Sequence, residues 1–301
     1  MKTPHWFLRK TPLAFVLWPA SMIYYGVYKI GFGIRKRNAY DAKRPIICIG
    51  NILAGGVGKT PIVREIAKYF NAPVVMRGYK QDIKSGRCSD EAVMLASSGI
   101  QVHTGDRKSN IMLLDRQSDK TPIVMDDGFQ NPSIKKDISM VVFDESIGLG
   151  NGFLLPAGPL REGRGALLRA DAFIVIQSGA PKKTRLELPV GKPIFYVKPK
   201  TVSPYSGNQR VVAFAGIGYP KKFFRNLKNV VATKSFPDHY QYTDDDLQKL
   251  IKLAEKKKAK LITTEKDWVR LSPEYQEKIK FASLELSIDK ELFAWLKDKL
   301  K

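Results

Sequence analysis

The chain has 301 residues, enough for one large or two ordinary domains, and 44% of them are hydrophobic and 27% charged. This composition excludes disordered, collagen-like and polytopic membrane proteins. Two cysteines are too few for a disulfide framework or a four-cysteine zinc site, and so low a count suits a reducing cytosol. The net charge of +22 points to anionic partners: nucleic acid, an acidic membrane surface or a phosphorylated substrate.

The N-terminal segment combines an uncharged stretch with flanking basic residues. Residues 11–28 carry no charge, and residues 1–44 contain nine Lys or Arg and one acid, Asp41. A secretory signal is not indicated, because the stretch is followed by a basic run and not by a small-residue cleavage site. A transmembrane helix needs about 20 apolar residues, whereas this stretch is shorter and contains Pro12 and Pro19.

Besides a spanning helix, two arrangements of this segment are open. A helix in the membrane interface would place Trp6, Trp18 and the tyrosines of residues 24–28 at headgroup depth, with its flanking cations on anionic lipid. A helix buried against the rest of the protein is the alternative. We favour the interfacial helix because basic residues lie on both sides, whereas a spanning helix usually has an asymmetric charge distribution. Residues 1–40 are therefore expected to form a membrane-anchoring helix.

After this segment, short β-branched runs alternate with helical patterns. Such alternation predicts an α/β fold with a mostly parallel sheet covered on both faces. Residues 178–210, rich in Pro, Gly and Lys, predict a linker or crossover before a second α/β set, in which Thr243 and Asp246 predict a capping box. We expect one domain over residues 41–200 and a smaller one over residues 201–301.

The strongest motif is a glycine-rich loop between an apolar strand and a helical pattern. Glycines let successive backbone N–H groups turn toward phosphate oxygens, while Lys59 would reach the β- and γ-phosphates and Thr60 would place its hydroxyl on Mg²⁺. Leu53 stands where the strict Walker A pattern has its first glycine. The predicted nucleotide-binding residues are Gly55, Gly56, Val57, Gly58, Lys59 and Thr60.

A second apolar run ends in two carboxylates, Asp126 and Asp127. This is the form of a Walker B element, in which an Asp holds Mg²⁺ directly or through water. A capped turn would explain the pair alone, but the preceding phosphate loop favours the metal role. Membrane-associated ATPase switches of the deviant Walker type have a similar loop with a lysine directly before its first glycine. Ala54 stands at that position, which argues against this alternative.

Further polar clusters each have a simple structural explanation as well as a functional one. Asp90 and Glu91 open a helical pattern and could be ordinary first-turn acids. His239 is the one histidine on a loop between predicted elements, and it follows an acid. Arg161 and Glu162 end a proline-rich loop that either faces a phosphate and a metal ion or forms a surface turn. Nucleic-acid binding is supported by the net charge alone, without a recognition motif.

Taken together and in order, these motifs resemble the tetraacyldisaccharide 4′-kinases, the lipid A pathway kinases of Gram-negative bacteria. The phosphate loop of that family also lacks the first Walker glycine, so Leu53 fits it. The resemblance covers nearly the whole chain, including the hydrophobic N-terminal helix. The matching stretches are GNILAGGVGKTP at 50–61, RGY at 77–79, SDE at 89–91, DDGFQ at 126–130, LPAGPLRE at 155–162, FAGIGYP at 214–220, FPDHY at 236–240 and TTEKD at 263–267.

This resemblance implies transfer of the γ-phosphate of ATP to the 4′-hydroxyl of a tetraacylated glucosamine disaccharide 1-phosphate, giving lipid IVA, with Mg²⁺ as cofactor. The implied location is the cytoplasmic face of the bacterial inner membrane, as a peripheral or monotopic protein. The implied fold is a P-loop α/β/α domain joined to a smaller C-terminal α/β domain that closes over the active site. The implied partners are the lipid substrate and the membrane surface, with no nucleic acid and no obligate protein partner.

The resemblance also implies roles for individual residues. Asp90 and His239 correspond to a catalytic dyad in which Asp90 accepts the proton of the sugar hydroxyl. The implied Mg²⁺ ligands are Thr60, Asp126, Asp127 and Glu162, and the implied contacts to substrate or phosphate are Arg77, Glu91, Gln130 and Arg161.

Two positions depart from the family pattern. Asn131 stands where the family's DDGFQH has its histidine, and Ala92 stands where GDEP has its proline. Because Asn131 cannot titrate near neutral pH, it cannot take over a proton-transfer or charged role of that histidine.

Overall fold

The computed structural model describes residues 4–78, 89–177, 186–218 and 220–301. The chain forms two compact units, the first of residues 4–199 and 286–301 and the second of residues 200–285. Each unit contains a parallel arrangement of strands with its own hydrophobic core.

In the first unit the strand order is β3–β2–β4–β1–β5–β6–β7, and neighbouring strands are parallel. Strands covered on both faces are apolar at successive positions, and β1, β4, β5 and β6 are buried throughout. The predicted mostly parallel α/β fold is confirmed. The strands are β1 (Ile46–Gly50), β2 (Val74–Met76), β3 (Val102–Thr104), β4 (Ile123–Asp126), β5 (Ile138–Asp144), β6 (Ala172–Ile176) and β7 (Ile194–Val202).

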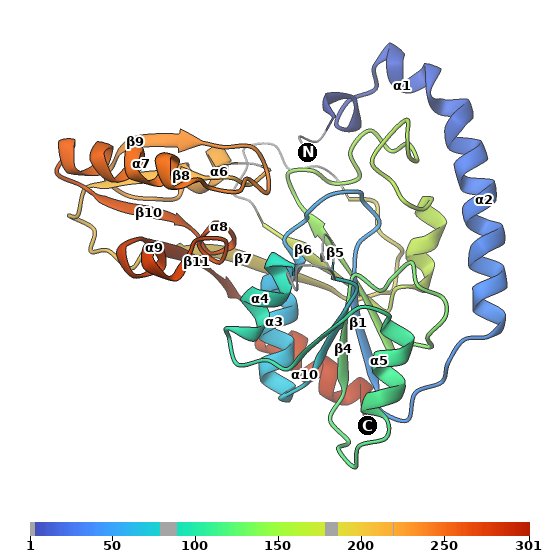
Figure 1. The fold of residues 1–301 in the computed structure, drawn as a ribbon. Helices are drawn as coiled ribbons and strands as arrows, with labels where there is room; N and C mark the ends of the chain where they lie inside the picture. Colours follow the sequence, from blue (N-terminus) through green and yellow to red (C-terminus); the bar gives the residue numbers. More distant parts are fainter. Residues whose placement is uncertain (1–3, 79–88, 178–185, 219) are drawn as a thin grey trace. The chain divides into compact units, whose positions relative to one another are not determined.

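Helices cover both faces of this sheet, with α3 and α4 on one face and α5 on the other (Figure 1). Right-handed crossovers keep consecutive helices on one face while the chain moves in one direction along the sheet, and change the face when it turns back. The helices are η1 (His5–Phe7), α1 (Pro12–Val16), α2 (Trp18–Arg37), α3 (Lys59–Phe70), α4 (Asp90–Ala96), α5 (Arg107–Leu114) and η2 (Arg164–Arg169).

Strand β1 lies between β4 and β5, where the strand order reverses. Its register aligns Ile49 with Asp126, so the loops that leave β1 and β4 start side by side. Gly50 allows them to approach closely, since an ideal Cβ there would lie 2.5 Å from Cβ and 3.1 Å from N of Phe129. Open parallel sheets bind ligands outside the carboxyl ends of their strands at such a reversal. The glycine-rich loop and the acidic pair share this edge.

The N-terminal segment forms the two helices α1 and α2. One side of α2 packs on the first unit through the fully buried Ser21. The opposite side is exposed and apolar, and we call it the outer face of α2. In the described part of the chain, no helix combines the length and apolar character needed to cross a bilayer. The outer face consists of Ile23, Val27, Ile30 and Ile34.

The second unit has the strand order β11–β10–β8–β9, again parallel. The predicted capping box at α7 is confirmed: Asp246 N donates to Thr243 Oγ1 (3.2 Å), and Thr243 N donates to Asp246 Oδ2 (3.1 Å). The elements are β8 (Val211–Ala215), α6 (Pro220–Arg225), β9 (Val230–Ser235), α7 (Asp244–Lys256), β10 (Lys260–Thr264), α8 (Glu265–Trp268), α9 (Pro273–Lys278) and β11 (Lys280–Ser287).

The last helix, α10 (Lys290–Lys299), belongs to the first unit and not to the expected 201–301 domain. Its Leu292 is fully buried in the core of the first unit, and Phe293 stacks on Tyr69 of α3 with ring centroids 4.2 Å apart. An amphipathic pattern shows which side of a helix is apolar, but not which core receives it.

The predicted linker at residues 178–210 also contains regular structure. Within it, β7 pairs with β6 in parallel, with Phe173 aligned to Ile194. The residues at the start of this strand alternate between buried and exposed, as a strand requires, but the proline, glycine and lysine residues around it obscured the pattern. Residues 178–185 lie outside the described residues.

Candidate nucleotide and metal site

The loop between β1 and α3 has the backbone geometry of a phosphate-binding loop. Gly55 and Gly58 have φ of 115° and 81°, in the left-handed region that glycine tolerates best. Gly58 is the N-cap of α3, so the free N–H groups and positive dipole end of that helix open onto the loop. Lys59 and Thr60 begin the helix, as the motif requires.

Asp127 joins the loop to two cations. Its Oδ1 lies 3.0 Å from Lys59 Nζ, and its Oδ2 accepts a hydrogen bond from Arg161 Nη1 at 2.9 Å. Burial would raise the pKa of Asp127, but the two cations outweigh burial and hold it well below the usual range. Asp127 is therefore a carboxylate at any physiological pH.

Asp126 has the opposite electrostatic environment. It is the buried last residue of β4, and its Oδ1 has no hydrogen-bond partner. Burial raises the pKa of Asp126 to about 6 against the opposing effect of Lys59, and the charge of Asp127 adds to the rise. A cation at this carboxylate would hold it ionised.

Arg107, at the start of α5, fixes the backbone of the acidic pair. Its Nη2 donates to the carbonyl oxygens of Asp126 (2.9 Å) and Asp127 (3.0 Å). Burial lowers the pKa of Arg107, while both carboxylates oppose this. Sequence reasoning missed this residue, because an arginine that binds main-chain carbonyls of another strand leaves no local pattern.

The loop at residues 154–162 adds Arg161 and Glu162. Arg161 N donates to Ile52 O (2.7 Å), which ties this loop to the end of β1. Glu162 is only 3% exposed, and its Oε2 accepts from Arg169 Nη2 at 2.6 Å. The Arg169 guanidinium lies over the Phe129 ring, 4.9 Å from its centroid.

The turn after Asp127 is held by amide side chains. Gln130 Nε2 donates to Asn51 O at 2.7 Å. Asn131, which replaces the histidine of the family pattern, accepts from both N (3.1 Å) and Oγ (2.5 Å) of Ser133. Asn131 therefore caps a turn in this chain.

The residues around the loop fit a hard divalent cation. Several buried side-chain oxygens of this region have no hydrogen-bond donor in the described part of the chain. Such oxygens can coordinate Mg²⁺ directly or accept hydrogen bonds from its water ligands. No group of three or more His, Cys, Asp or Glu in the described ranges has metal-site geometry. These oxygens are Asn51 Oδ1, Asp126 Oδ1, Gln130 Oε1 and Glu162 Oε1.

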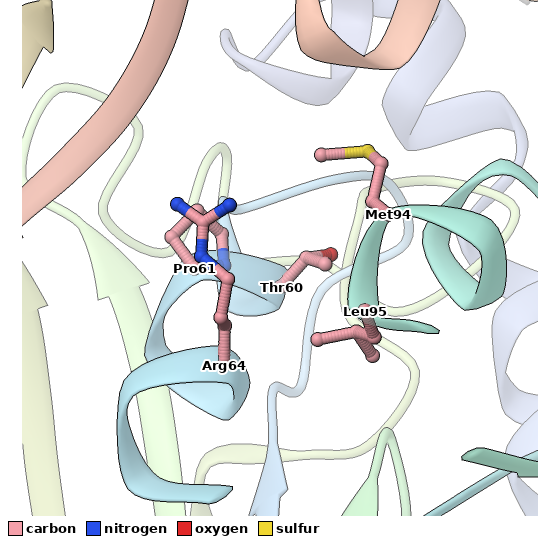
Figure 2. A pocket seen from close by; sticks show the side chains of 5 residues that line it. All are labelled: Thr60, Pro61, Arg64, Met94 and Leu95. Carbon is pink, nitrogen blue, oxygen red and sulfur yellow. The ribbon is translucent and has the colours of Figure 1, made fainter. Parts of the chain in front are cut away.

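Helix α4 brings the acids of the SDE stretch toward the same loop. Ser89 caps the helix, with Ala92 N donating to its Oγ at 3.3 Å, so Asp90 and Glu91 occupy the first turn. The charge of Glu91 contributes to the raised pKa of Asp126. Figure 2 shows how α3 and α4 meet around a small pocket. Its lining residues are Thr60, Pro61, Arg64, Met94 and Leu95.

Arg77 is exposed at the end of β2, and its charge helps to lower the pKa of Arg107. Tyr79 of the RGY stretch lies outside the described residues. In the first unit, the structure thus brings Lys59, Glu91, Asp126, Asp127 and Arg161 into one electrostatic cluster.

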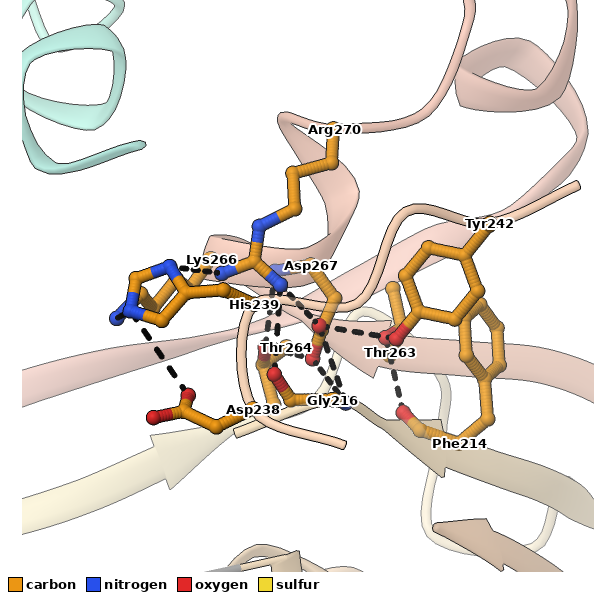
Figure 3. A network of polar contacts seen from close by, with 10 residues as sticks. All are labelled: Phe214, Gly216, Asp238, His239, Tyr242, Thr263, Thr264, Lys266, Asp267 and Arg270. Carbon is orange, nitrogen blue, oxygen red and sulfur yellow. Dashed lines mark hydrogen bonds and ion pairs between the residues drawn. The ribbon is translucent and has the colours of Figure 1, made fainter. Parts of the chain in front are cut away.

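His239 lies in the second unit, within a separate polar network (Figure 3). Its φ is 59°, and its N–H donates to Gly216 O at 3.0 Å. Lys266 Nζ lies 3.3 Å from Nε2, and Arg270 Nη2 lies 3.5 Å from Nδ1. The two members of the expected dyad, Asp90 and His239, are therefore on different units.

Asp267 organises this second network. It is fully buried and accepts hydrogen bonds from Tyr242 Oη (2.9 Å), Thr264 Oγ1 (2.6 Å) and Arg270 Nη1 (3.0 Å), and from Gly216 N. Burial, with the charge of Asp267, raises the pKa of Tyr242. The TTEKD stretch thus fixes the turn that carries His239, through Arg270.

A parallel sheet with a glycine-rich loop after β1 and a carboxylate pair at the end of β4 defines the class of P-loop α/β proteins. Comparison with known sequences then gives the family. A family model described as tetraacyldisaccharide-1-P 4′-kinase matches residues 13–301, and the chain belongs to this family. The predicted family is thereby confirmed, and the deviant Walker ATPase alternative is not supported.

Curated relatives named tetraacyldisaccharide 4′-kinase align over most of the chain. The protein of Chelativorans sp. is 34% identical over 93% of this chain and 88% of its own length. That of Paramagnetospirillum magneticum is 35% identical over 96% and 95%, and that of Rickettsia peacockii is 32% identical over 95% and 94%. A crystal structure of LpxK from Aquifex aeolicus in complex with ATP has the same fold, with a TM-score of 0.77, 23% identity and coverage of 96% of this chain and 98% of that chain.

The opposite pKa shifts of the acidic pair predict how stability depends on pH. Folding raises the pKa of Asp126 from 3.8 to about 6, so its ionisation destabilises the folded state increasingly as pH rises through this window. Asp126→Asn removes that penalty. The difference in free energy of unfolding between Asp126→Asn and wild type should therefore be about 1 kcal/mol more favourable to the variant at pH 7.5 than at pH 5. Urea denaturation without Mg²⁺ at the two pH values measures this difference.

Asp127→Asn is the matched control. The pKa of Asp127 is lowered by folding, so both of its pKa values lie below pH 5 and the carboxylate stabilises equally at both pH values. This variant should be destabilised by the same amount at pH 5 and pH 7.5. An Asp126→Asn difference that does not change with pH would contradict the assigned burial penalty.

Proposed function

We propose that the protein transfers the γ-phosphate of ATP to the 4′-hydroxyl of a tetraacylated glucosamine disaccharide 1-phosphate, producing lipid IVA. Membership of the 4′-kinase family gives the reaction class. The observation that carries the proposal for this chain is the contact of Asp127 with both Lys59 and Arg161 at the glycine-rich loop. Lys59 at the N-terminus of α3 and Arg161 beside it complement the negative charge of a triphosphate.

Binding of the triphosphate requires an exchange of partners. Lys59 leaves its ion pair with Asp127 for the β- and γ-phosphates, and Arg161 turns from the same carboxylate to a phosphate oxygen. Mg²⁺ would be held by Thr60 with Asp126 and Asp127, and Glu162 would support it. When bound, the metal ion neutralises charge on the transferred phosphoryl group.

Asp90 is assigned as the general base that accepts the proton of the attacking hydroxyl, and His239 as its partner in catalysis. Arg77, Glu91 and Gln130 are assigned to substrate or phosphate contacts. The Gln130 amide holds the backbone of Asn51, so its contribution is to keep the loop in place. Phosphoryl transfer needs alignment, charge neutralisation and one proton acceptor, and this set provides each of them.

The protein is proposed to act as a peripheral or monotopic protein at the cytoplasmic face of the bacterial inner membrane. The outer face of α2 is apolar, and basic residues follow it at 35–37. An apolar helix face next to cations binds anionic lipid surfaces. No nucleic acid and no obligate protein partner are part of the proposal, because lipid headgroups and a phosphorylated substrate account for the positive charge.

The reaction is tested by incubating the protein with ATP, Mg²⁺ and tetraacyl disaccharide 1-phosphate. Mass spectrometry should detect one added phosphate on the lipid. Lys59→Ala should reduce transfer by at least about 10²-fold, since a charge that stabilises the transferred phosphoryl group is lost. Lys68→Ala, which changes an exposed lysine of the same helix, is the control and should retain full activity. Near-normal transfer by Lys59→Ala would contradict the phosphate-binding role.

The dyad is tested by kinetics. Asp90→Ala should lower kcat about 10²–10⁴-fold with little change in KM for ATP, because a general base contributes that much and phosphate binding rests on other residues. If His239 acts through Asp90, the kcat of the double variant Asp90→Ala/His239→Ala should be little lower than the kcat of the less active single variant. Fully additive losses would show two independent roles.

Membrane association is tested on the outer face of α2. Ile23 and Val27 are 72% and 69% exposed, so the double variant Ile23→Glu/Val27→Glu leaves the packed side of the helix unchanged. Binding to vesicles containing anionic lipid should fall about tenfold or more in sedimentation assays, because two apolar contacts become charged. Val190→Glu, at a fully exposed site elsewhere, should bind as wild type does. Equal binding by all three proteins would assign the membrane contact to another surface.

A further inference from the structure

The side of α2 opposite its outer face contacts the loop at residues 154–162 through polar groups. The fully buried Ser21 makes two hydrogen bonds to this loop: its Oγ donates to Leu154 O at 2.9 Å and accepts from Ala157 N at 3.2 Å. One turn further, Tyr24 Oη donates to Arg161 O at 3.1 Å. One hydroxyl thus satisfies both a donor and an acceptor of the loop backbone.

The next two residues on this side approach Glu162. The Tyr28 ring packs between Tyr24 and Phe32, with ring centroids 6.3 Å and 5.8 Å apart. The Tyr28 hydroxyl and Glu162 Oε1 are both buried without a hydrogen-bond partner among the described residues, and the charge of Glu162 acts on Tyr28. The Phe32 ring lies 4.9 Å from the guanidinium of Arg169, which donates to Glu162. Residues 21, 24, 28 and 32 follow helical spacing and so line one side of α2. We call this side the inner face of α2.

The same loop is bound from its other side by the phosphate loop. Ala54 N donates to Pro159 O at 2.7 Å, and Arg161 N donates to Ile52 O at 2.7 Å. The loop at residues 154–162 therefore lies between the glycine-rich loop and α2. The inner face of α2 packs against the loop that carries Arg161 and Glu162, on the side opposite the glycine-rich loop.

We propose that Ser21, Tyr24 and Tyr28 are positioning residues, which hold Arg161 and Glu162 where a nucleotide phosphate and Mg²⁺ are bound. This rests on the proposed function in so far as Arg161 and Glu162 serve ATP. The hydroxyls of Ser21 and Tyr24 fix the backbone of the loop at Leu154, Ala157 and Arg161. Arg169 holds Glu162 Oε2, and the buried Tyr28 hydroxyl is a donor available to the unpaired Oε1 of the same carboxylate. Residues behind a metal-binding or phosphate-binding side chain commonly set its orientation and affinity.

The first test reads the loop directly by hydrogen–deuterium exchange of the full-length protein. In Ser21→Ala, the amide of Ala157 loses its acceptor, so peptides covering residues 154–162 should exchange at least about threefold faster than in wild type. Peptides from β1 and α3 should be unchanged. Ser21→Thr keeps a hydroxyl and should restore protection. Unchanged exchange of residues 154–162 in Ser21→Ala would overturn the positioning role of Ser21.

The second test measures Mg²⁺-dependent binding of a fluorescent ATP analogue, without any lipid substrate. Tyr28→Phe should raise the Mg²⁺ concentration needed for half-maximal binding about tenfold. Tyr25→Phe is the matched control on the same helix, since Tyr25 contacts Lys29 by a cation–π interaction. It should behave as wild type does. Identical Mg²⁺ dependence in Tyr28→Phe and wild type would overturn the proposal.

These readouts separate the inference from the proposed reaction. If the protein fails to phosphorylate the tetraacyl disaccharide but Tyr28→Phe still shifts the Mg²⁺ dependence, the acceptor assignment is wrong and the positioning role stands. If lipid phosphorylation is confirmed while neither variant changes loop exchange or Mg²⁺ dependence, the positioning role is wrong. Should Ser21→Ala unfold, seen as fast exchange in β1, the Ser21→Thr and Tyr28→Phe measurements still decide.

Discussion

The site depends on one half-buried carboxylate held between two cations. Asp127 attracts Lys59 from the start of α3 and Arg161 from a distant loop, and without it two positive charges would face each other at a partly buried position. The same cations make Asp127 a strong acid, whereas its neighbour Asp126 is weakened by burial. Adjacent carboxyl groups in unlike surroundings thereby take different roles, one as a charged partner of the cations and one open to a metal ion.

This arrangement follows from the sheet. The register of β1 and β4 starts the glycine-rich loop and the acidic turn side by side, and Gly50 leaves room for Phe129 to cross directly against the strand. The Arg107 side chain, from α5, donates to the backbone carbonyls of Asp126 and Asp127. The position of the two carboxylates is therefore set by contacts to their backbone from a third element. The ionised groups can exchange partners while the chain that carries them stays in place.

Much of this could be predicted from sequence because the signals are local. The β1–loop–α3 motif, the acids at the end of β4 and the Thr243 cap each lie within a few residues whose chemistry is self-contained. Arg107, the burial of Asp267 and the packing of α10 could not be predicted in this way. Each depends on which distant segment is next to it: Arg107 on carbonyls of another strand, Asp267 on Tyr242 and Arg270, and α10 on Tyr69. Likewise, the hydrophobicity of α2 suggested a membrane contact but gave no indication that Ser21 is fully buried against another loop.

The two unlike sides of α2 have a consequence for chimeric proteins. On the proposed membrane role, a foreign membrane anchor fused in place of α2 would restore attachment to lipid, because that attachment would depend only on apolar and basic surface. It would not restore the hydroxyl contacts to Leu154, Ala157 and Arg161, since those require particular side chains at fixed helical positions. The N-terminal helix can therefore be exchanged between proteins only if the residues of the inner face of α2 are kept. By its contacts, α2 is a structural part of the first unit and not a separate anchor.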